Sequence, residues 1–120
     1  MYEIIFYTDK NGKQPILEYI QELNRRSDKD SRIKPNKIYD YIDHLREVGP
    51  RATEPYAKHL GDGIYELRPI RDRILYAAWD GNAFILLHHF MKDTQKTPPR
   101  EIQKAKRNLK DYRERSDNNE

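Results

Sequence analysis

The sequence predicts an α+β fold, in which a small, twisted, mainly antiparallel sheet carries an N-terminal helix pair and a further helix follows at the C-terminus. Strand-like runs rich in aromatic and β-branched residues occur at the N-terminus and again in the second half of the chain. Two apolar stripes at helical spacing lie between these runs, and a third follows them. The 120 residues suit one domain, which we expect at residues 1–115 with a polar tail at 116–120.

The N-terminal region is predicted to form a strand and then a helix. Residues 2–8, YEIIFYT, are typical of a strand, and the Asp-Lys-Asn-Gly sequence that follows indicates a turn. Apolar residues recur at helical spacing over residues 13–26. Pro15 suits the first turn of this helix, where a missing N–H costs little. We expect the first strand to join the sheet beside one of the later strands.

A second helix is indicated by an apolar stripe that runs from Ile38 to Val48, and the Gly-Pro pair at residues 49–50 ends it. Pro35 fits either the first turns of this helix or a break in front of it. A polar turn near residues 27–30 separates the two helical segments. We therefore expect an antiparallel helix pair that packs on one face of the sheet.

The second half of the chain is predicted to contain three strands and one helix. The strands are expected at residues 64–70, 73–80 and 83–90. The Asp-Gly-Asn sequence at residues 80–82 indicates a hairpin, and residues 71–72 form a tighter connection, so these strands must be antiparallel. A double proline introduces a helix over residues 100–113. The predicted order is β-α-α-β-β-β-α, with residues 56–60 outside its strands.

Composition excludes several kinds of chemistry. The chain has no cysteine, which rules out disulfides and thiolate catalysis. The four histidines, at positions 44, 59, 88 and 89, lack the spacing of metal ligands, and no P-loop or nucleophile elbow occurs. We expect no metal and no cofactor. We find no signal peptide and no apolar run of the roughly 20 residues that span a bilayer, so we expect a cytoplasmic protein without membrane contact.

Positive charge is concentrated near the C-terminus. The net charge is only +3, but residues 97–115 hold seven basic and three acidic side chains, whereas residues 1–55 hold ten of each. The chain as a whole contains nine tyrosines, which together with Lys and Arg are common on nucleic-acid surfaces, although tyrosine is also typical of half-buried strands. The residues expected to contact RNA are Arg71, Lys96, Arg100, Lys104 and Arg107. The alternative is that the last helix has an ordinary solvated face.

A group of polar side chains is expected at one end of the strands. Because side chains alternate along a strand, Glu66 and Arg68 point to the same side, and Arg73 lies near the start of the next strand. The histidines at positions 88 and 89 point to opposite faces, and Lys92 follows the last strand. The sequence therefore predicts that Glu66, Arg68, Arg73, Lys92 and one histidine converge on one region of the sheet.

Such a group is suited to cleave RNA without a metal. Attack of the 2′-hydroxyl on the adjacent phosphate needs a base, cations for the developing charge, and an acid for the leaving 5′-oxygen. The candidate base is Glu66 or a histidine. Of the histidines, we name His89. Arg68 and Arg73 suit the phosphate, and Lys92 or a histidine completes charge neutralisation or proton transfer. The alternative is that each arginine is solvated or pairs with a nearby acid, and that the histidines line the core.

Four stretches of the second half resemble a known family of proteins. They are GIYELR, RILYAAW, ILLHHF and TQKTPPREIQKA, all within residues 60–112. In this combination the chain resembles toxins of the RelE/ParE superfamily, specifically the HigB-like, phage-derived branch of type II toxin–antitoxin systems. The strand–helix–helix layout before these stretches fits as well. The resemblance implies a RelE-like fold and a ribosome-dependent, metal-independent mRNA endoribonuclease that inhibits translation and growth.

The resemblance also implies roles for individual residues. Arg68 and Arg73 match phosphate-binding positions of the family, and Lys92 matches a basic active-site position. Glu66 stands where the RelE branch has a lysine, and Asp93 stands where nearby members often have a second lysine. No tyrosine of this chain is matched to the one that acts on RNA in the RelE branch. The general base therefore stays unassigned.

The implied partners are a helix-turn-helix antitoxin of the HigA type, the ribosome and mRNA, with toxin and antitoxin in a heterodimer or heterotetramer. The antitoxin either covers the basic site or binds the outer helices and sterically blocks entry into the ribosome. Two other functions stay open: a non-enzymatic inhibitor of DNA gyrase, as in the ParE branch, and a simple nucleic-acid-binding module. Because the ParE branch generally lacks the basic set, Arg68, Arg73 and Lys92 favour the endoribonuclease.

Overall fold

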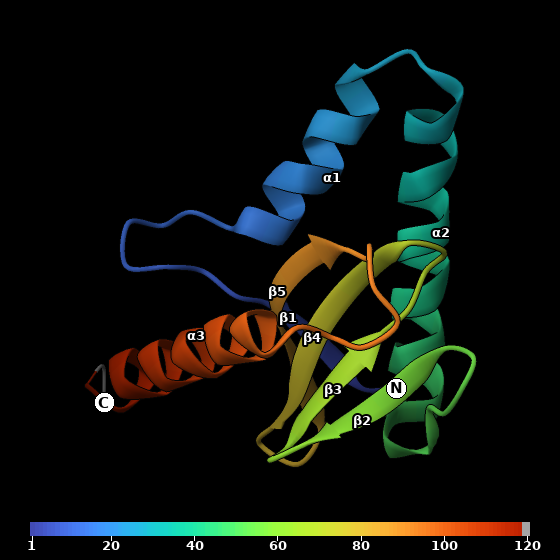
Figure 1. Cartoon of the computed structure of the whole chain (residues 1–120). Helices are drawn as coiled ribbons and strands as arrows, with labels where there is room; N and C mark the ends of the chain where they lie inside the picture. The colour runs from blue at the N-terminus through green and yellow to red at the C-terminus, as the bar shows by residue number, and fades with distance from the viewer. Residues whose placement is uncertain (119–120) are drawn as a thin grey trace.

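A five-stranded mixed sheet lies between an N-terminal helix pair and a single C-terminal helix (Figure 1). The structure, a computed structural model, describes residues 1–118. Its elements are β1 (Glu3–Phe6), α1 (Pro15–Arg25), α2 (Lys29–Val48), the short 3₁₀ helix η1 (Gly49–Arg51), β2 (Ala57–Gly61), β3 (Ile64–Leu67), β4 (Asp72–Trp79), β5 (Ala83–Met91) and α3 (Pro99–Asn118). The predicted α+β class and the helix pair on the sheet are confirmed.

The strands are ordered β1-β5-β4-β3-β2, and only the β1–β5 pair is parallel. This arrangement confirms the mainly antiparallel sheet and the place of the first strand beside a late one. The predicted order lacked β2, which pairs with β3 through Ala57 and Leu67. The sequence of β2, AKHLG, has no strand-like apolar run, because this strand lies at the sheet edge and exposes its lysine and histidine.

The two faces of the sheet carry two separate apolar cores. In β4, Ile74 and Tyr76 pack against the core that includes α1 and α2, while Leu75 and Ala77 pack against the core that includes α3. The central strands are therefore covered on both sides, which explains why their sequences are almost continuously apolar.

The second helix begins earlier than the sequence indicated. Asp28 caps its N-terminus, because the carboxylate accepts a hydrogen bond of 3.1 Å from the backbone N–H of Ser31. Pro35 consequently lies inside α2, which corrects the expectation that it falls in the first turns or marks a break. Its ring is buried on the same side of the helix as Ile38 and Ile42. Burial of this apolar face opposes the cost of the missing N–H.

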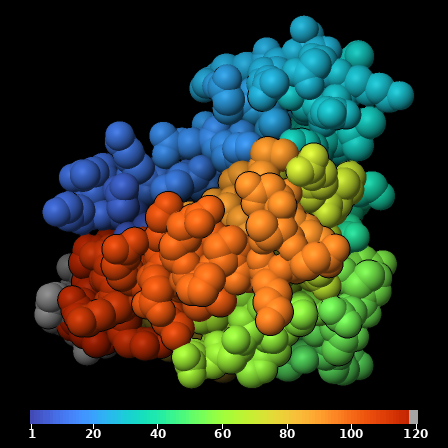
Figure 2. All heavy atoms as spheres, in the orientation of Figure 1, coloured from blue at the N-terminus to red at the C-terminus, as the bar shows by residue number. Residues whose placement is uncertain are grey.

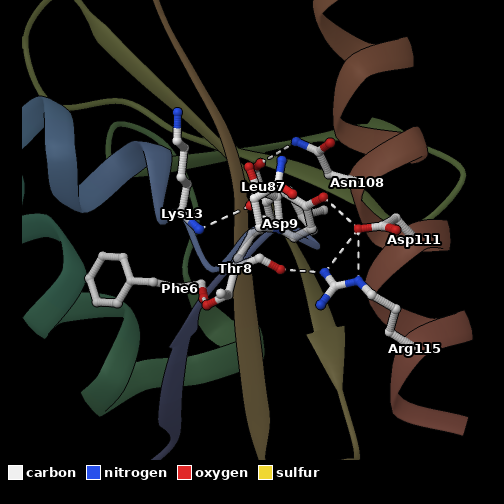
Figure 3. Close-up of polar contacts among 10 residues, drawn as sticks. Phe6, Thr8, Asp9, Lys13, Leu87, Asn108, Asp111 and Arg115 are labelled. Atoms are coloured by element: carbon white, nitrogen blue, oxygen red, sulfur yellow. Dashed lines mark hydrogen bonds and ion pairs between the residues drawn. The ribbon is translucent and has the colours of Figure 1, made fainter. Parts of the chain in front are cut away.

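The second half of α3 is tied to the segment after β1 and to β5 by polar contacts that Figure 3 draws. The hydroxyl of Tyr7 donates to Asp111 at 2.6 Å, and burial, aided by Asp111, raises the pKa of this phenol to about 12. Arg115 donates to Asp111 and to the carbonyl of Thr8, and Asn108 donates to the carbonyl of Leu87 at 2.8 Å. With these anchors α3 continues to Asn118, beyond the predicted end at residue 113, while residues 119–120 of the predicted tail lie outside the described residues.

Each helix presents one apolar stripe to the sheet and a polar surface to solvent. The buried residues of α1, for example, are Ile16, Ile20 and Leu23. Within residues 1–118, none of the helices combines the length and the apolar character that crossing a bilayer requires.

The packing of Gly49 generates a stability prediction. A Cβ at this position would overlap the ring of Tyr2, which is itself packed on Phe84 with ring centroids 5.5 Å apart. Gly63 also has a positive φ, +78° against +57° at Gly49, but open space around it. We expect Gly49→Ala to lower the free energy of unfolding by about 1–2 kcal/mol more than Gly63→Ala, as measured by urea denaturation. Equal losses would show that the Tyr2 ring moves aside freely.

Candidate nucleic-acid interface

Two connections meet beside the start of β4 and enclose an open hollow of about 430 Å³. One is the β3–β4 connection and the other is the β5–α3 connection, and Figure 2 shows them side by side, in yellow-green and orange. We call this region, with the crevice that adjoins it, the basic hollow. It is lined by Glu66, Arg68, Ile70, Arg71, Arg73, Phe90, Lys92, Asp93, Thr94, Gln95, Lys96 and Thr97. The structure thus brings together Glu66, Arg68, Arg73 and Lys92, as the strand alternation predicted, and adds Arg71 and Lys96.

Arg73 is the most fixed cation of the basic hollow, with a side chain only 7% exposed. Its Nη1 donates to the carbonyl of Ile70 at 2.9 Å and to that of Asp72 at 2.8 Å, while its Nε lies 3.8 Å from Glu66. Burial lowers the pKa of Arg73 below its ordinary value, but a guanidinium stays protonated at physiological pH. The fold therefore holds a positive charge in one place before any ligand arrives.

Glu66 forms ion pairs with two arginines of the site, Arg68 and Arg73. Its side chain is 4% exposed, and Oε1 lies 3.5 Å from Nε of Arg68 and 3.8 Å from Nε of Arg73. The other oxygen, Oε2, accepts a hydrogen bond of 2.5 Å from the hydroxyl of Thr97. Both oxygens are thus engaged within the protein, in a position that orients the arginines. No sequence pattern indicated Thr97 as a partner of Glu66, because the only distinctive feature of Thr97 is its place before the double proline that starts α3.

Arg68 bridges two carboxylates and so has less capacity to bind a ligand than Arg73 does. Besides its contact with Glu66, it donates from Nη1 to Glu54 at 2.9 Å. Glu54 lies in the connection before β2. The exposed end of this pair is open to solvent, since Glu54 is 63% exposed. A phosphate would compete with Glu54 for the same guanidinium group.

The remaining cations of the hollow are not paired with an acid in the described part of the chain. Among residues 1–118, no carboxylate lies within ion-pair distance of Arg71, Lys92 or Lys96. Arg71 donates to the carbonyl of Lys92 at 3.0 Å, and the N–H of Lys92 donates to the carbonyl of Arg71 at 2.8 Å. These two bonds extend the β4–β5 pairing into the connections and fix the backbone that carries both cations. The excess positive charge of the hollow suits a polyanion.

The structure does not bring His89 to the basic hollow. His89 lies on the opposite face of the sheet, where its ring stacks on Tyr19 at 3.8 Å and its Nε2 lies 2.9 Å from Asp72. His88 is on the same face as α3, but its Nε2 lies 2.7 Å from Glu101. Both histidines therefore join helices to the sheet. Within the described part of the chain, no three His, Asp or Glu side chains cluster in a way that could hold a metal ion.

The cations of α3 form a stripe that leads away from the hollow. Arg100, Lys104 and Arg107 follow one another at helical spacing and are all exposed. Nε of Arg100 lies 3.5 Å from Glu101 and Nζ of Lys104 lies 4.0 Å from it, which leaves both charges largely in solvent. These three residues, predicted to bind RNA, thus lie on a second surface next to the hollow.

A comparison with family models places the chain among known sequences. The model of the phage derived protein Gp49-like (DUF891) matches residues 18–110, which is most of the chain. The chain belongs to this Gp49-like family. No curated protein matches its sequence. The matched range runs from α1 to α3 and includes every residue of the basic hollow, so the site belongs to the part of the chain that defines the family.

In this member of the Gp49-like family, the hollow is equipped to bind and polarise a phosphate. Arg73 is held in place, while Lys92 and Lys96 are free to follow the oxygens of a ligand. Glu66 is turned inward, and the other carboxylate that lines the hollow, Asp93, is exposed. Fixed and mobile cations around one point can stabilise charge that develops on a phosphorus centre.

The burial of His88 makes stability depend on pH. Burial lowers the pKa of His88 below its ordinary value of about 6.5 and outweighs the opposite effect of Glu101. The unfolded chain therefore binds a proton more readily than the folded chain does, so stability is lost as the pH falls below about 6.5.

We expect the free energy of unfolding to decrease between pH 7 and pH 5, and His88→Gln to weaken this decrease. Urea denaturation at several pH values measures it. His59→Gln, on an exposed edge strand, serves as the control. A decrease of the same size in His88→Gln and in the wild type would contradict the assignment to His88.

Proposed function

We propose that this protein is the toxin of a type II toxin–antitoxin system, a HigB-like member of the RelE/ParE superfamily. It would cleave mRNA on the ribosome without a metal ion and so inhibit translation and growth. The observation that carries the proposal is the basic hollow, in which a buried Arg73 lies beside the unpaired cation of Lys92. The Gp49-like family and the α+β fold support it.

The proposed reaction is an internal phosphoryl transfer. The 2′-oxygen of a ribose attacks the adjacent phosphorus and loses its proton to a base, the bond from phosphorus to the 5′-oxygen breaks, and that oxygen takes up a proton. The products are a 2′,3′-cyclic phosphate and a free 5′-hydroxyl. Arg73 and Arg68 would stabilise the additional charge on the phosphate oxygens. Lys92 is the cation of this set that is free to approach the leaving oxygen and donate a proton to it.

We assign Glu66 a positioning role in this scheme. Both of its oxygens are engaged, with the arginines on one side and Thr97 on the other, so it would act through the arginines. Neither Glu66 nor His89 is placed to take the 2′-proton from an RNA that lies in the hollow. The translating ribosome presents the message in the proposed reaction, and groups of the ribosome or the substrate are available as the base.

The proposed partners follow from the same surface. A helix-turn-helix antitoxin of the HigA type would neutralise the toxin in a heterodimer or heterotetramer, and the ribosome would supply the mRNA. An acidic segment of the antitoxin would be complementary to the basic hollow. We place the protein in the cytoplasm, where translating ribosomes are found.

The exposed cations of α3 support a second candidate, a nucleic-acid-binding module without catalysis. Arg100, Lys104 and Arg107 lie on an accessible stripe that needs no reaction to bind phosphate. A binding module would show affinity that falls steeply with salt, without toxicity. The two candidates therefore differ in what happens to a translated message inside a cell.

Inducible expression in a bacterium, followed by primer extension across an abundant message, tests the proposed function. We expect cuts in phase with codons that appear only when the message is translated. Arg73→Ala and Lys92→Ala should each reduce these cuts about a hundredfold, because each removes charge from the position of the phosphate. Circular dichroism of the purified variants checks that they fold.

Arg25→Ala is the matched control, because Arg25 is an exposed cation at the end of α1 and pairs with the exposed Glu22 of the same helix. It should leave both growth arrest and cutting unchanged. Growth arrest with intact messages would contradict the endoribonuclease and favour a gyrase inhibitor. The absence of any arrest would favour the binding module.

The role of Glu66 has its own test in a reconstituted translation assay. We expect Glu66→Gln to slow cleavage about tenfold without changing the shape of the pH–rate profile, because the amide retains a hydrogen bond to Thr97 but no longer attracts the arginines. Thr97→Val, which removes the other contact of Glu66, should give a smaller loss of the same kind. If Glu66→Gln abolished cleavage and removed a limb of the profile, Glu66 would be the base.

A further inference from the structure

Ile70 has a backbone conformation that its side chain disfavours. Its φ is +54°, in the left-handed region, where a β-branched residue is a true outlier. The other described non-glycine residues with positive φ are Asp62 and Asp80, a residue type that tolerates this region in turns. Ile70 is thus the position at which residue type and conformation disagree.

The conformation itself serves Arg73. The N–H of Asp72 donates to the carbonyl of Pro69 at 3.0 Å, which closes a turn around Ile70. In this turn the carbonyl of Ile70 accepts the hydrogen bond of 2.9 Å from Arg73. The backbone must therefore be left-handed here, but glycine, asparagine or aspartate would adopt the same turn with less strain. The contact with Arg73 explains the turn and leaves the isoleucine side chain unexplained.

Packing does not explain the side chain either, because Ile70 is 54% exposed. It lines the basic hollow together with Arg71, Arg73 and Lys92, where it provides apolar surface among cations. A nucleotide has the complementary chemistry, since its base has a flat apolar face and its phosphate is an anion a short distance away. Strain that persists at an exposed position of a ligand-sized hollow indicates a function for the side chain.

We propose that Ile70 is a contact for one base of the RNA, whose adjacent phosphate lies on Arg71, Arg73 and Lys92. This inference rests on the proposed function, because it places the substrate of that function in the hollow. The base lies against the side chain of Ile70 and the backbone phosphate faces the cations. Ile70 thereby sets which nucleotide of the message is held at the hollow.

The test is the binding of a short single-stranded RNA, made non-cleavable by 2′-deoxy substitution, measured by fluorescence anisotropy. We expect Ile70→Asn to bind about fivefold more weakly than the wild type, with the same dependence on salt, because the phosphate contacts remain. Its melting temperature should rise by about 3 °C, because asparagine tolerates the left-handed turn. Ile33→Asn is the matched control, since Ile33 is 42% exposed on α2, and it should bind like the wild type.

Weaker binding by Ile70→Asn could result from loss of a base contact or from a displacement of Arg73. A second series of RNAs, each with one base removed, distinguishes these two causes. Removal of one particular base should weaken binding to the wild type about fivefold and have no further effect on Ile70→Asn. Equal binding of the intact RNA by Ile70→Asn and the wild type would overturn the proposal. The proposal would also be overturned if removal of any base weakened binding to the wild type by the same factor. A change in the binding of a protein partner, with RNA binding unchanged, would overturn it as well.

The outcomes also separate this inference from the proposed function. If the wild type binds RNA with the expected base effect but leaves translated messages uncut, the endoribonuclease is wrong and the base contact stands. If translated messages are cut and Ile70→Asn changes neither binding nor the cut sites, the base contact is wrong and the endoribonuclease stands. If the wild type binds no RNA, the base contact is overturned.

Discussion

A buried carboxylate on β3 determines how the basic hollow is built. A carboxylate that is 4% exposed is tolerated in a fold only where cations and donors satisfy its oxygens. Glu66 meets this requirement with Arg68 from the residue that follows β3, Arg73 from β4 and Thr97 from the connection to α3. One side chain therefore joins three segments, and the arginines are oriented as a consequence of satisfying it. An apolar residue at this position would remove the carboxylate that Arg68 and Arg73 share.

A second buried carboxylate lies on the opposite face of the sheet, in Asp72, the residue before Arg73 on β4. Asp72 is 1% exposed and accepts hydrogen bonds of 2.7 Å from Tyr19 and 2.9 Å from Nε2 of His89. Although burial raises the pKa of Asp72, these bonds outweigh it and hold the pKa below its ordinary value. Because Asp72 faces α1 while Arg73 faces the hollow, the start of β4 is fixed from both layers. The position of Arg73 thus depends on how α1 is seated on the sheet.

The sequence was informative where a local rule applies and silent where long-range contacts decide. Alternation along strands placed Glu66 and Arg68 on one face without knowledge of the register, and it separated the two neighbouring histidines. It could not say which face each histidine takes, because that depends on where α1 and α3 pack. The turn around Ile70 was missed, and the strand was extended to residue 70, because isoleucine is a strand signal and no turn rule expects it at positive φ.

The distribution of charge along the chain decides how selective the hollow is. The net charge is only +3, because residues 1–55 balance their cations with as many acids. Attraction of a polyanion is therefore local, and salt screens exposed charges beyond about 8 Å at physiological ionic strength. In the proposed function, Arg73, which is fixed and largely desolvated, would set where a phosphate rests, while the exposed Arg71 and Lys96 and the half-buried Lys92 would attract it. A surface of this kind would hold free RNA weakly, so the proposed cleavage would require a partner that delivers the strand already extended, a role that the proposed function gives to the ribosome.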